Sequence, residues 1–203
     1  ELDRELLQET RAFHFGSLSL GVEPSRSATT EAVKLARRAG ALISFDVNYR
    51  PTLWTSPEEA YDRVMATVPH VNLLKVNEVE LALLGGSENI DAATQRLLGL
   101  GPELCVVTLG PDGSYFRIGE GGEHVPAFKV QTVDATGCGD AFIAGLLSQL
   151  VADANWHDQL SVARMREILR YANAVGALTA LSQGVIPALP TADQVDEFLA
   201  QQG

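Results

Sequence analysis

The sequence has few cysteines and no excess of basic residues, and both features exclude classes of protein. Two cysteines, Cys105 and Cys138, are too few for a disulfide framework and do not form a CxxC metal motif. Fifteen Lys and Arg residues stand against 26 Asp and Glu residues, which gives a net charge of −11. A chain this acidic is a poor match for a nucleic-acid backbone or an anionic membrane surface. We therefore expect neither as a partner.

Long apolar runs, targeting segments and several common motifs are also missing. No apolar stretch approaches the roughly 20 residues that cross a bilayer. No signal segment opens the chain, and no N-x-S/T site occurs. No glycine precedes a lysine, which excludes a P-loop, and neither G-x-S-x-G nor H-E-x-x-H is present. With 46% hydrophobic residues, the composition is that of a globular protein, and a reduced, cytoplasmic one is the default expectation.

Apolar stretches alternate with segments of helical periodicity along the 203 residues. Such alternation predicts βαβ units and a mostly parallel sheet with helices on both faces, so we expect a single α/β domain over 1–203. Two alternating stretches with a Gly-rich turn between them add a β hairpin. The predicted strands are 12–20, 41–47, 70–76 and 103–110, the hairpin is 114–119 with 124–130, and the helices are 27–39, 56–68, 77–85, 91–99, 137–152, 162–181 and 193–202.

Capping residues set several of these helix ends. Ser27 is the expected N-cap of one helix and Gly40 its stop signal, and Ser56 with Pro57 is the expected start of the next helix. The chain opens at Glu1, without a methionine, in a segment that we interpret as the middle of a helix. We therefore expect that the natural protein is longer.

Polar or Gly-rich turns follow four of the predicted strands. They are 48–50, 77–80, 110–113 and 134–140. In open α/β sheets, ligands bind beyond the carboxyl ends of the strands. The four turns are therefore expected to converge on one crevice.

The turn at 134–140 carries the most chemical information. Gly137 and Gly139 lie where a helix is predicted to begin, so the free N–H groups of its first turn could bind an anion. Asp140 follows in that first turn. A carboxylate beside a phosphate suggests a base that accepts the proton of an attacking hydroxyl, as in a kinase for a small substrate. The alternative is an ordinary turn in which Asp140 only complements the helix dipole.

The segment VDATGCGDAFIAGLL (133–147) resembles the signature of the ribokinase-like (PfkB) carbohydrate kinases, D-T/A-T-G-A-G-D-A/S-F. The departure is Cys138, where the family usually has alanine. Further resemblance lies in Asn77-x-x-Glu80, in VTLGPDGS (107–114) and in YANAVGALTALSQG (171–184), so it covers essentially the whole chain in the right order. Within the family, 13–20, 23–28 and 45–54 resemble fructokinases most closely.

This resemblance implies a three-layer α/β/α fold and ATP-dependent phosphorylation of a sugar primary hydroxyl, with fructose converted to fructose 6-phosphate as the leading reaction. It implies that Asp140 is the general base and that the backbone N–H groups of Gly137, Cys138 and Gly139 form an anion hole. Arg50 and Asn48 would contact the sugar or a phosphate; alternatively, they only cap the end of a strand.

The resemblance also implies sites for ATP, magnesium and potassium. Asn77 and Glu80 would hold phosphates, and Glu80 would bind Mg²⁺ through water. Asn173 would lie near the adenine. The remaining nucleotide-binding residues would be Thr108, Leu109, Gly110, Pro111, Asp112 and Gly113, and the monovalent-cation site would be formed by Asp134, Thr136, Thr179, Ser182 and Gly184.

Cys138 carries a hypothesis of its own. Only its backbone N–H is needed for the anion hole, so a small thiol should be tolerated there. A thiol at a helix N-terminus can have a lowered pKa and react readily. We therefore expect alkylation of Cys138 that slows when Mg·ATP is added.

Members of the resembled family carry an N-terminal part that this sequence does not contain. It holds the first strands, a sugar-binding motif and a β lid, through which a homodimer often forms. The exact sugar therefore stays open, with 2-keto-3-deoxygluconate or another sugar as the alternative to fructose. An alternative of a different class is a non-catalytic module that binds nucleotide or a partner protein.

Overall fold

The computed structural model describes residues 2–153 and 155–202, which divide into two compact units. The first contains the residues up to Val107 together with Phe116–Gly122, and the second contains Thr108–Tyr115 and the residues from Glu123 onward. Strands pair in the order β1-β2-β3-β4-β5-β6, and the β1–β2 and β2–β3 pairs are parallel. This mostly parallel sheet confirms the predicted α/β class. The strands are β1 (Ala12–Gly16), β2 (Leu42–Asp46), β3 (Leu73–Asn77), β4 (Leu104–Thr108), β5 (Ser114–Ile118) and β6 (Gly121–Val125).

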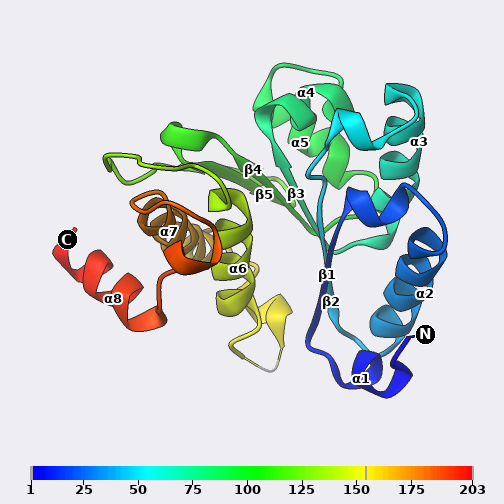
Figure 1. Cartoon of the computed structure of the whole chain (residues 1–203), viewed down its shortest axis with the longest axis horizontal. Coiled ribbons are helices and arrows are strands. Elements are labelled where there is room, and N and C mark those ends of the chain that lie inside the picture. Colours follow the sequence, from blue (N-terminus) through cyan, green and yellow to red (C-terminus); the bar gives the residue numbers. More distant parts are fainter. Residues whose placement is uncertain (1, 154, 203) are drawn as a thin grey trace. The chain divides into compact units, whose positions relative to one another are not determined.

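In the first unit, β2 is buried along its whole length. All five of its residues are buried, as expected for a parallel strand with both faces covered. Phe45 of β2 lies in register with Phe15 of β1, and their rings stack at 4.8 Å. Figure 1 shows α2 lying alongside these two strands. The helices of this unit are α1 (Arg4–Glu9), α2 (Ser25–Arg38), α3 (Pro57–Thr67), α4 (Glu78–Gly85) and α5 (Ile90–Leu98), with short 3-10 turns η1 (Ser17–Leu20), η2 (Pro51–Leu53) and η3 (Val68–His70).

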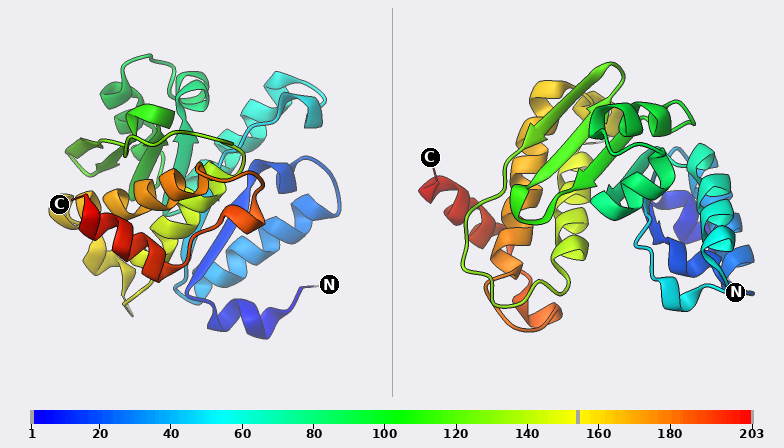
Figure 2. Two further views of the ribbon diagram at one scale, coloured as in Figure 1. Left: turned by 60° about the vertical axis from the view of Figure 1, so that its left-hand side comes forward. Right: turned by 90° about the horizontal axis from the view of Figure 1, so that it is seen from above.

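In the second unit, α6 packs closely against α7, and α8 follows α7 (Figure 2). Gly145 of α6 allows this approach, because a Cβ there would lie 2.8 Å from Val175 Cγ2. Phe198 of α8 meets Phe128 edge to face at 5.0 Å. The helices of this unit are α6 (Cys138–Leu150), α7 (Val162–Thr179) and α8 (Ala192–Gln201), with 3-10 turns η4 (Gly110–Asp112), η5 (Trp156–Gln159) and η6 (Ile186–Ala188).

Three predictions about the first forty residues are wrong. The strand predicted over 12–20 ends at Gly16 and continues as the 3-10 turn η1. Ser27 is not an N-cap, because α2 begins earlier, at Ser25, and the Glu23 carboxylate accepts the Ser27 N–H at 3.2 Å. The opening segment is not helix interior, since α1 begins at Arg4 with Asp3 as its N-cap.

The predicted hairpin is present, but its second arm is earlier than expected. β6 covers Gly121–Val125 instead of 124–130, because the turn after β5 is short. Pro126 follows β6 and has no N–H with which to extend the ladder. The caps at Ser56 and Gly40 are confirmed: Ser56 accepts the Glu59 N–H, and Gly40 has a φ of 83° directly after α2.

Candidate functional site

The N-terminus of α6 forms the centre of the candidate site in the second unit. Gly137 is its N-cap in the left-handed conformation, with a φ of 81°. The Cys138 N–H donates to the Ala135 carbonyl at 3.3 Å. Among the described residues, no acceptor takes the N–H groups of Gly137 and Gly139. Two of the three predicted anion-hole donors are therefore free to receive a ligand.

Val185 closes one side of this turn. A Cβ placed on Gly137 would lie only 2.6 Å from Val185 Cγ1, so both the backbone angle and the available space require glycine. Val185 was not among the predicted residues, because its contact with Gly137 joins residues 48 positions apart in the sequence.

Asp140 lies in the first turn of α6, as predicted. Its side chain is exposed, and it has no hydrogen-bond or ion-pair partner within residues 2–153 and 155–202. The structure therefore presents Asp140 as an unengaged acceptor next to free backbone N–H groups.

The expected lowering of the Cys138 pKa is wrong in its direction. Partial burial raises the pKa of Cys138, and the nearby Asp134 carboxylate raises it further. The Cys138 sulfur lies 3.8 Å from the Asp134 carbonyl oxygen. Burial and a neighbouring negative charge thus outweigh the helix terminus at this position.

Asp134 ties the turn before α6 to the loop after α7. Its carboxylate accepts the N–H groups of Thr136 at 2.9 Å and Gly184 at 3.3 Å, and these hydrogen bonds lower the Asp134 pKa. The Ala180 carbonyl accepts the N–H groups of Val133 and Asp134. The structure therefore brings together the two segments that were predicted to hold a monovalent cation.

Two other predicted residues of that cation site, Thr179 and Ser182, form hydrogen bonds with backbone groups at the end of α7. The Thr179 hydroxyl is buried and donates to the Val175 carbonyl at 2.8 Å. The Ser182 N–H donates to the Thr179 carbonyl at 3.5 Å. The Thr179 side-chain oxygen is thus committed, while backbone carbonyls of the loop and the Asp134 carboxylate are the groups that we consider for an ion.

The segment 108–113 forms a tight turn at the end of β4. The Leu109 N–H donates to the Gly113 carbonyl at 2.8 Å, and Gly110 and Gly113 both have positive φ values, of 56° and 106°. A Cβ on Gly113 would collide with the backbone of Val125 and Pro126. The turn leaves 110–112 exposed, which suits a contact with a ligand.

Asn173 of α7 is buried, and its amide binds the protein itself. The Asn173 side chain donates to the carbonyls of Val125 at 3.1 Å and Pro126 at 3.3 Å. It therefore fixes the chain where β6 ends, a role that its predicted place near the adenine did not include.

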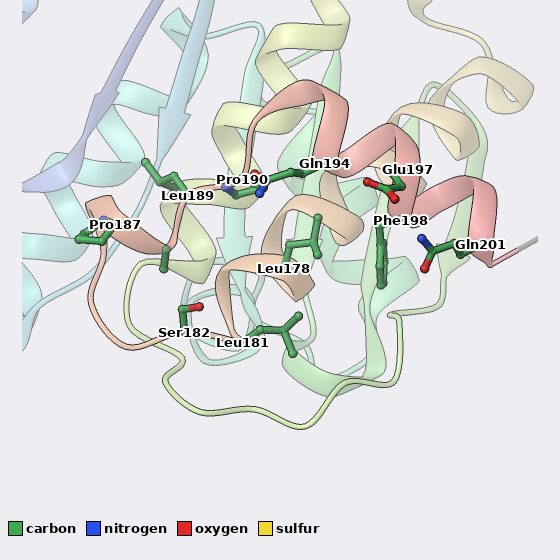
Figure 3. Close-up of a pocket in the computed structure, with 11 residues that line it drawn as sticks. Leu178, Leu181, Ser182, Pro187, Leu189, Pro190, Gln194, Glu197, Phe198 and Gln201 are labelled. Carbon is green, nitrogen blue, oxygen red and sulfur yellow. The ribbon is translucent and has the colours of Figure 1, made fainter.

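A hollow of the second unit lies beside the candidate site. It has a volume of about 440 Å³ and lies between the end of α7 and α8, lined among others by Leu178, Ser182 and Phe198 (Figure 3). Its described lining includes Ser182 of the predicted cation loop and no residue of 134–140. This hollow is therefore adjacent to the proposed chemistry and does not contain it.

In the first unit, a buried ion pair supports the loop after β2. Lys75 Nζ lies 2.8 Å from Asp46 Oδ2, and both residues are buried. The other oxygen of Asp46 accepts the Asn48 N–H at 3.1 Å. Asn48 has a φ of 40°, in the left-handed region, so this hydrogen bond helps to hold an uncommon backbone conformation.

Asn77 and Glu80 form a capping box at the start of α4. The Asn77 side chain accepts the Glu80 N–H, and the Glu80 carboxylate accepts the Asn77 N–H, each at 2.9 Å. The second Glu80 oxygen accepts the Tyr49 N–H at 2.7 Å. Burial raises the pKa of Glu80, against these hydrogen bonds. Glu80 is 2% exposed and its carboxylate is already engaged, so it presents little surface to a hydrated magnesium ion.

Arg50 is exposed, and among residues 2–153 and 155–202 its side chain has one hydrogen bond, a local one from Nη1 to the Tyr49 carbonyl at 3.3 Å. Its guanidinium is therefore available to an external anion. Tyr49 and Lys75 were not among the predicted site residues. For Lys75 a signal was available, namely a lysine in the largely apolar strand LLKVN, because a buried lysine needs a charged partner.

The predicted residues thus form two groups, one in each unit. The first unit holds Asn48, Arg50, Asn77 and Glu80, which share the Tyr49 loop or α4. The second unit holds the 108–113 turn, the 134–140 turn, Asn173 and the 179–184 loop. In the described part of the chain, no three His, Cys, Asp or Glu side chains group as metal ligands, and no helix is long and apolar enough to span a membrane.

Comparison with known proteins gives consistent matches. A family model described as pfkB family carbohydrate kinase matches residues 1–192. Fructokinase-1 from Oryza sativa subsp. japonica is 41% identical over 197 residues, which cover 96% of this chain and 60% of that protein.

Two solved structures are also similar. Fructokinase from Vibrio cholerae O395, in its fructose, ADP and calcium ion bound form, has a TM-score of 0.86 at 32% identity over 98% of this chain and 64% of that one. Aminoimidazole riboside kinase from Salmonella enterica, complexed with aminoimidazole riboside and an ATP analog, has a TM-score of 0.83 at 35% identity over 93% and 62%. The chain spans about three fifths of the length of these relatives.

Proposed function

This chain belongs to the pfkB family of carbohydrate kinases, and we propose that it is the nucleotide-binding and catalytic part of an enzyme that phosphorylates a sugar primary hydroxyl with ATP. The observation that carries the proposal is the N-terminus of α6. There, an unengaged carboxylate, Asp140, directly follows the free N–H groups of Gly137 and Gly139. An acceptor for a proton and donors for an oxyanion are the two parts that phosphoryl transfer requires.

In the proposed reaction, Asp140 accepts the proton of the sugar hydroxyl. The hydroxyl oxygen forms a bond to the γ-phosphorus, and the bond between that phosphorus and the oxygen of ADP breaks. The N–H groups of Gly137 and Gly139 stabilise the charge on the transferring phosphoryl group. The Cys138 N–H would join them only after leaving the Ala135 carbonyl.

The nucleotide would lie against the exposed turn 110–112, and Arg50 would bind a phosphate or the sugar. The chemistry that bound Mg²⁺ supplies is neutralisation of phosphate charge. Glu80 would act on such an ion only through water, while its main role is to hold Asn77 and Tyr49. A monovalent cation, potassium in our proposal, would be held by Asp134 and backbone carbonyls of the 179–184 loop.

Fructose is the proposed substrate. The support is the identity to a rice fructokinase and the likeness to a fructose-bound enzyme. Because a riboside kinase has a similar TM-score, other sugars are also candidate substrates, in addition to 2-keto-3-deoxygluconate. A cytoplasmic location, and a homodimer formed through a lid, remain predictions from the sequence.

The test is ADP release from Mg·ATP in potassium buffer, with fructose, 2-keto-3-deoxygluconate, ribose, aminoimidazole riboside or no sugar. Asp140→Asn should lower sugar-dependent turnover by about 10²–10⁴-fold, the usual contribution of a general base. Asp193→Asn is the matched control, because Asp193 is also an exposed acid in the first turn of a helix. Unchanged turnover in Asp140→Asn would overturn the assignment. Nucleotide binding without turnover on any sugar would favour a non-catalytic module.

A further inference from the structure

We propose that the hollow between α2 and α3 is a binding site for a small organic anion with an apolar body. The hollow lies entirely within the first unit and has a volume of about 320 Å³. That volume is at the lower end of the range for small-molecule pockets, roughly 300–1,000 Å³. Nothing in the proposed kinase reaction uses it.

Two helix faces form its walls. The residues contributed by α2 are spaced three or four positions apart, so they form one continuous stripe of the helix. A second stripe with the same spacing comes from α3 and the turn after it. The α2 stripe is Arg26, Thr29, Thr30, Val33, Lys34 and Arg37, and the opposite stripe is Arg63, Ala66, Thr67 and His70.

The floor and much of the walls are apolar. Phe15 and Leu20 are buried and close the bottom of the hollow. The Thr30 and Thr67 hydroxyls donate to carbonyls of their own helices, those of Arg26 and Arg63, each at 2.8 Å. Thr29 and His70 also remain as polar side chains of the lining, and the charged groups open to a ligand are the cationic ends of the four Lys and Arg side chains.

The charge of the lining has one sign. Four of the chain's 15 Lys and Arg residues line this hollow, and the described lining includes no Asp or Glu. The chain as a whole has a net charge of −11, so the positive charge of this lining is opposite in sign to the net charge of the protein. The one acid on α2, Glu31, pairs with Arg4 and is not part of the lining.

Two of the four cations lack a counter-charge. Arg26 pairs with Glu23 at 2.7 Å, and Arg63 lies 3.8 Å from Glu59. Within the described residues, Lys34 and Arg37 have no ion-pair partner, and they lie three positions apart on the same stripe. The α2 dipole favours cations in the last turn, but Arg38 satisfies that preference equally and does not line the hollow. An apolar floor beneath two unpaired cations fits an anion attached to an apolar group.

The probe is 1-naphthoate, titrated into the full chain by isothermal titration calorimetry, with 1-naphthamide as its uncharged counterpart. We expect the naphthoate to bind at least about fivefold more tightly than the amide. The variant with both Lys34→Gln and Arg37→Gln should weaken naphthoate binding by about tenfold or more. Arg38→Gln is the matched control and should change the affinity less than about twofold, because Arg38 does not line the hollow.

A second variant tests the cavity itself. Ala66→Phe places a ring in the hollow from the α3 side and should abolish binding of both probes, with an unchanged circular dichroism spectrum. If naphthoate gives no binding heat up to about 10 mM, a concentration above ordinary metabolite affinities, the proposal is wrong. Equal naphthoate affinity in the wild type and the double variant would also overturn it.

Discussion

Lys75 and Asp46 form an ion pair at 2.8 Å with side-chain exposures of only 7% and 4%. The pair joins neighbouring parallel strands, since Lys75 lies on β3 and Asp46 on β2, directly opposite in the register. Asp46 also accepts the Asn48 N–H, so the pair supports the left-handed residue of the loop that carries Arg50. One buried lysine therefore stabilises a segment that the proposed reaction uses.

Replacing Lys75 by methionine should destabilise the protein strongly. The change leaves the Asp46 carboxylate buried without a counter-charge, and breaking such pairs costs about 3–5 kcal/mol. The measurement is the free energy of unfolding from urea titration. The variant with both Lys75→Met and Asp46→Asn should recover a large part of the loss. A loss below about 1 kcal/mol, the ordinary range of an exposed pair, would show that the pair is not buried in solution.

Replacing Glu80 by glutamine should also lower stability, by about 1–2 kcal/mol, the usual cost of losing a capping acceptor or leaving a buried donor unpaired. The Glu80 carboxylate accepts two backbone N–H groups, from Asn77 and Tyr49, while an amide has only one acceptor oxygen. Glu78→Gln is the matched control, because Glu78 lies exposed in the same first turn of α4. Equal unfolding free energies for the two variants would contradict the double-acceptor role.

The raised pKa of Glu80 adds a pH dependence with a defined sign. Since burial raises the folded-state pKa above 4.5, the folded state binds the proton more tightly than the unfolded chain does. The stability that this proton contributes is complete below pH 4.5 and is lost as the pH rises through the higher folded pKa. The stability difference between the wild type and Glu80→Gln should therefore vary over that window. A constant difference from pH 4.5 to 7 would count against the shift.

Local patterns in the sequence predicted much of the fold and of the α6 terminus. Gly137 and Asp140 occupy their expected places because capping geometry depends on a few neighbouring residues. The sequence also placed Asn77 and Glu80 together, three positions apart in one motif. Their third partner, the Tyr49 N–H, lies 31 positions from Glu80 and follows only from the tertiary fold.

The wrong predictions concern properties that a local sequence pattern does not show. The Cys138 pKa rises because of burial and Asp134, and neither effect is visible in a helix-start pattern. The end of β6 depends on the Asn173 amide, 47 or 48 positions away, which binds the carbonyls of 125 and 126. The predicted strand extended beyond Pro126 because that prediction rested only on the alternation of apolar and polar residues.

Gly137→Ala should lower sugar-dependent ADP release and stability together. The alanine would face two costs, a left-handed φ of 81° and an approach of 2.6 Å to Val185 Cγ1. Gly40→Ala is the matched control, because Gly40 has a φ of 83° with nothing within 4 Å of the new Cβ. It should lose about 1 kcal/mol, the cost of the backbone conformation alone, and keep its activity. If Gly137→Ala is no worse than Gly40→Ala, the contact with Val185 has no importance.

Cys138 should react slowly with iodoacetamide at pH 7, and its rate should increase with pH, because its pKa is raised and the thiolate is the reacting form. Cys105, fully buried with a pKa of about 12, should remain unlabelled in the folded protein. Peptide mass spectrometry separates the two sites, and Cys138→Ser should remove the labelling. Mg·ATP should slow the reaction if the nucleotide covers the α6 terminus. Faster labelling than free cysteine at pH 7 would contradict the raised pKa.

Asp134→Asn should loosen the connection between the turn before α6 and the loop after α7. The carboxylate accepts the Thr136 and Gly184 N–H groups through separate oxygens, and an amide can retain only one of these hydrogen bonds. We expect faster hydrogen exchange at the Gly184 amide and a higher potassium concentration for half-maximal ADP release. Asp193→Asn should change neither, because Asp193 lies in α8, outside both segments. The two readouts separate the structural role from the ionic one: faster exchange with an unchanged potassium dependence would leave Asp134 as a loop tether and remove it from the proposed cation site.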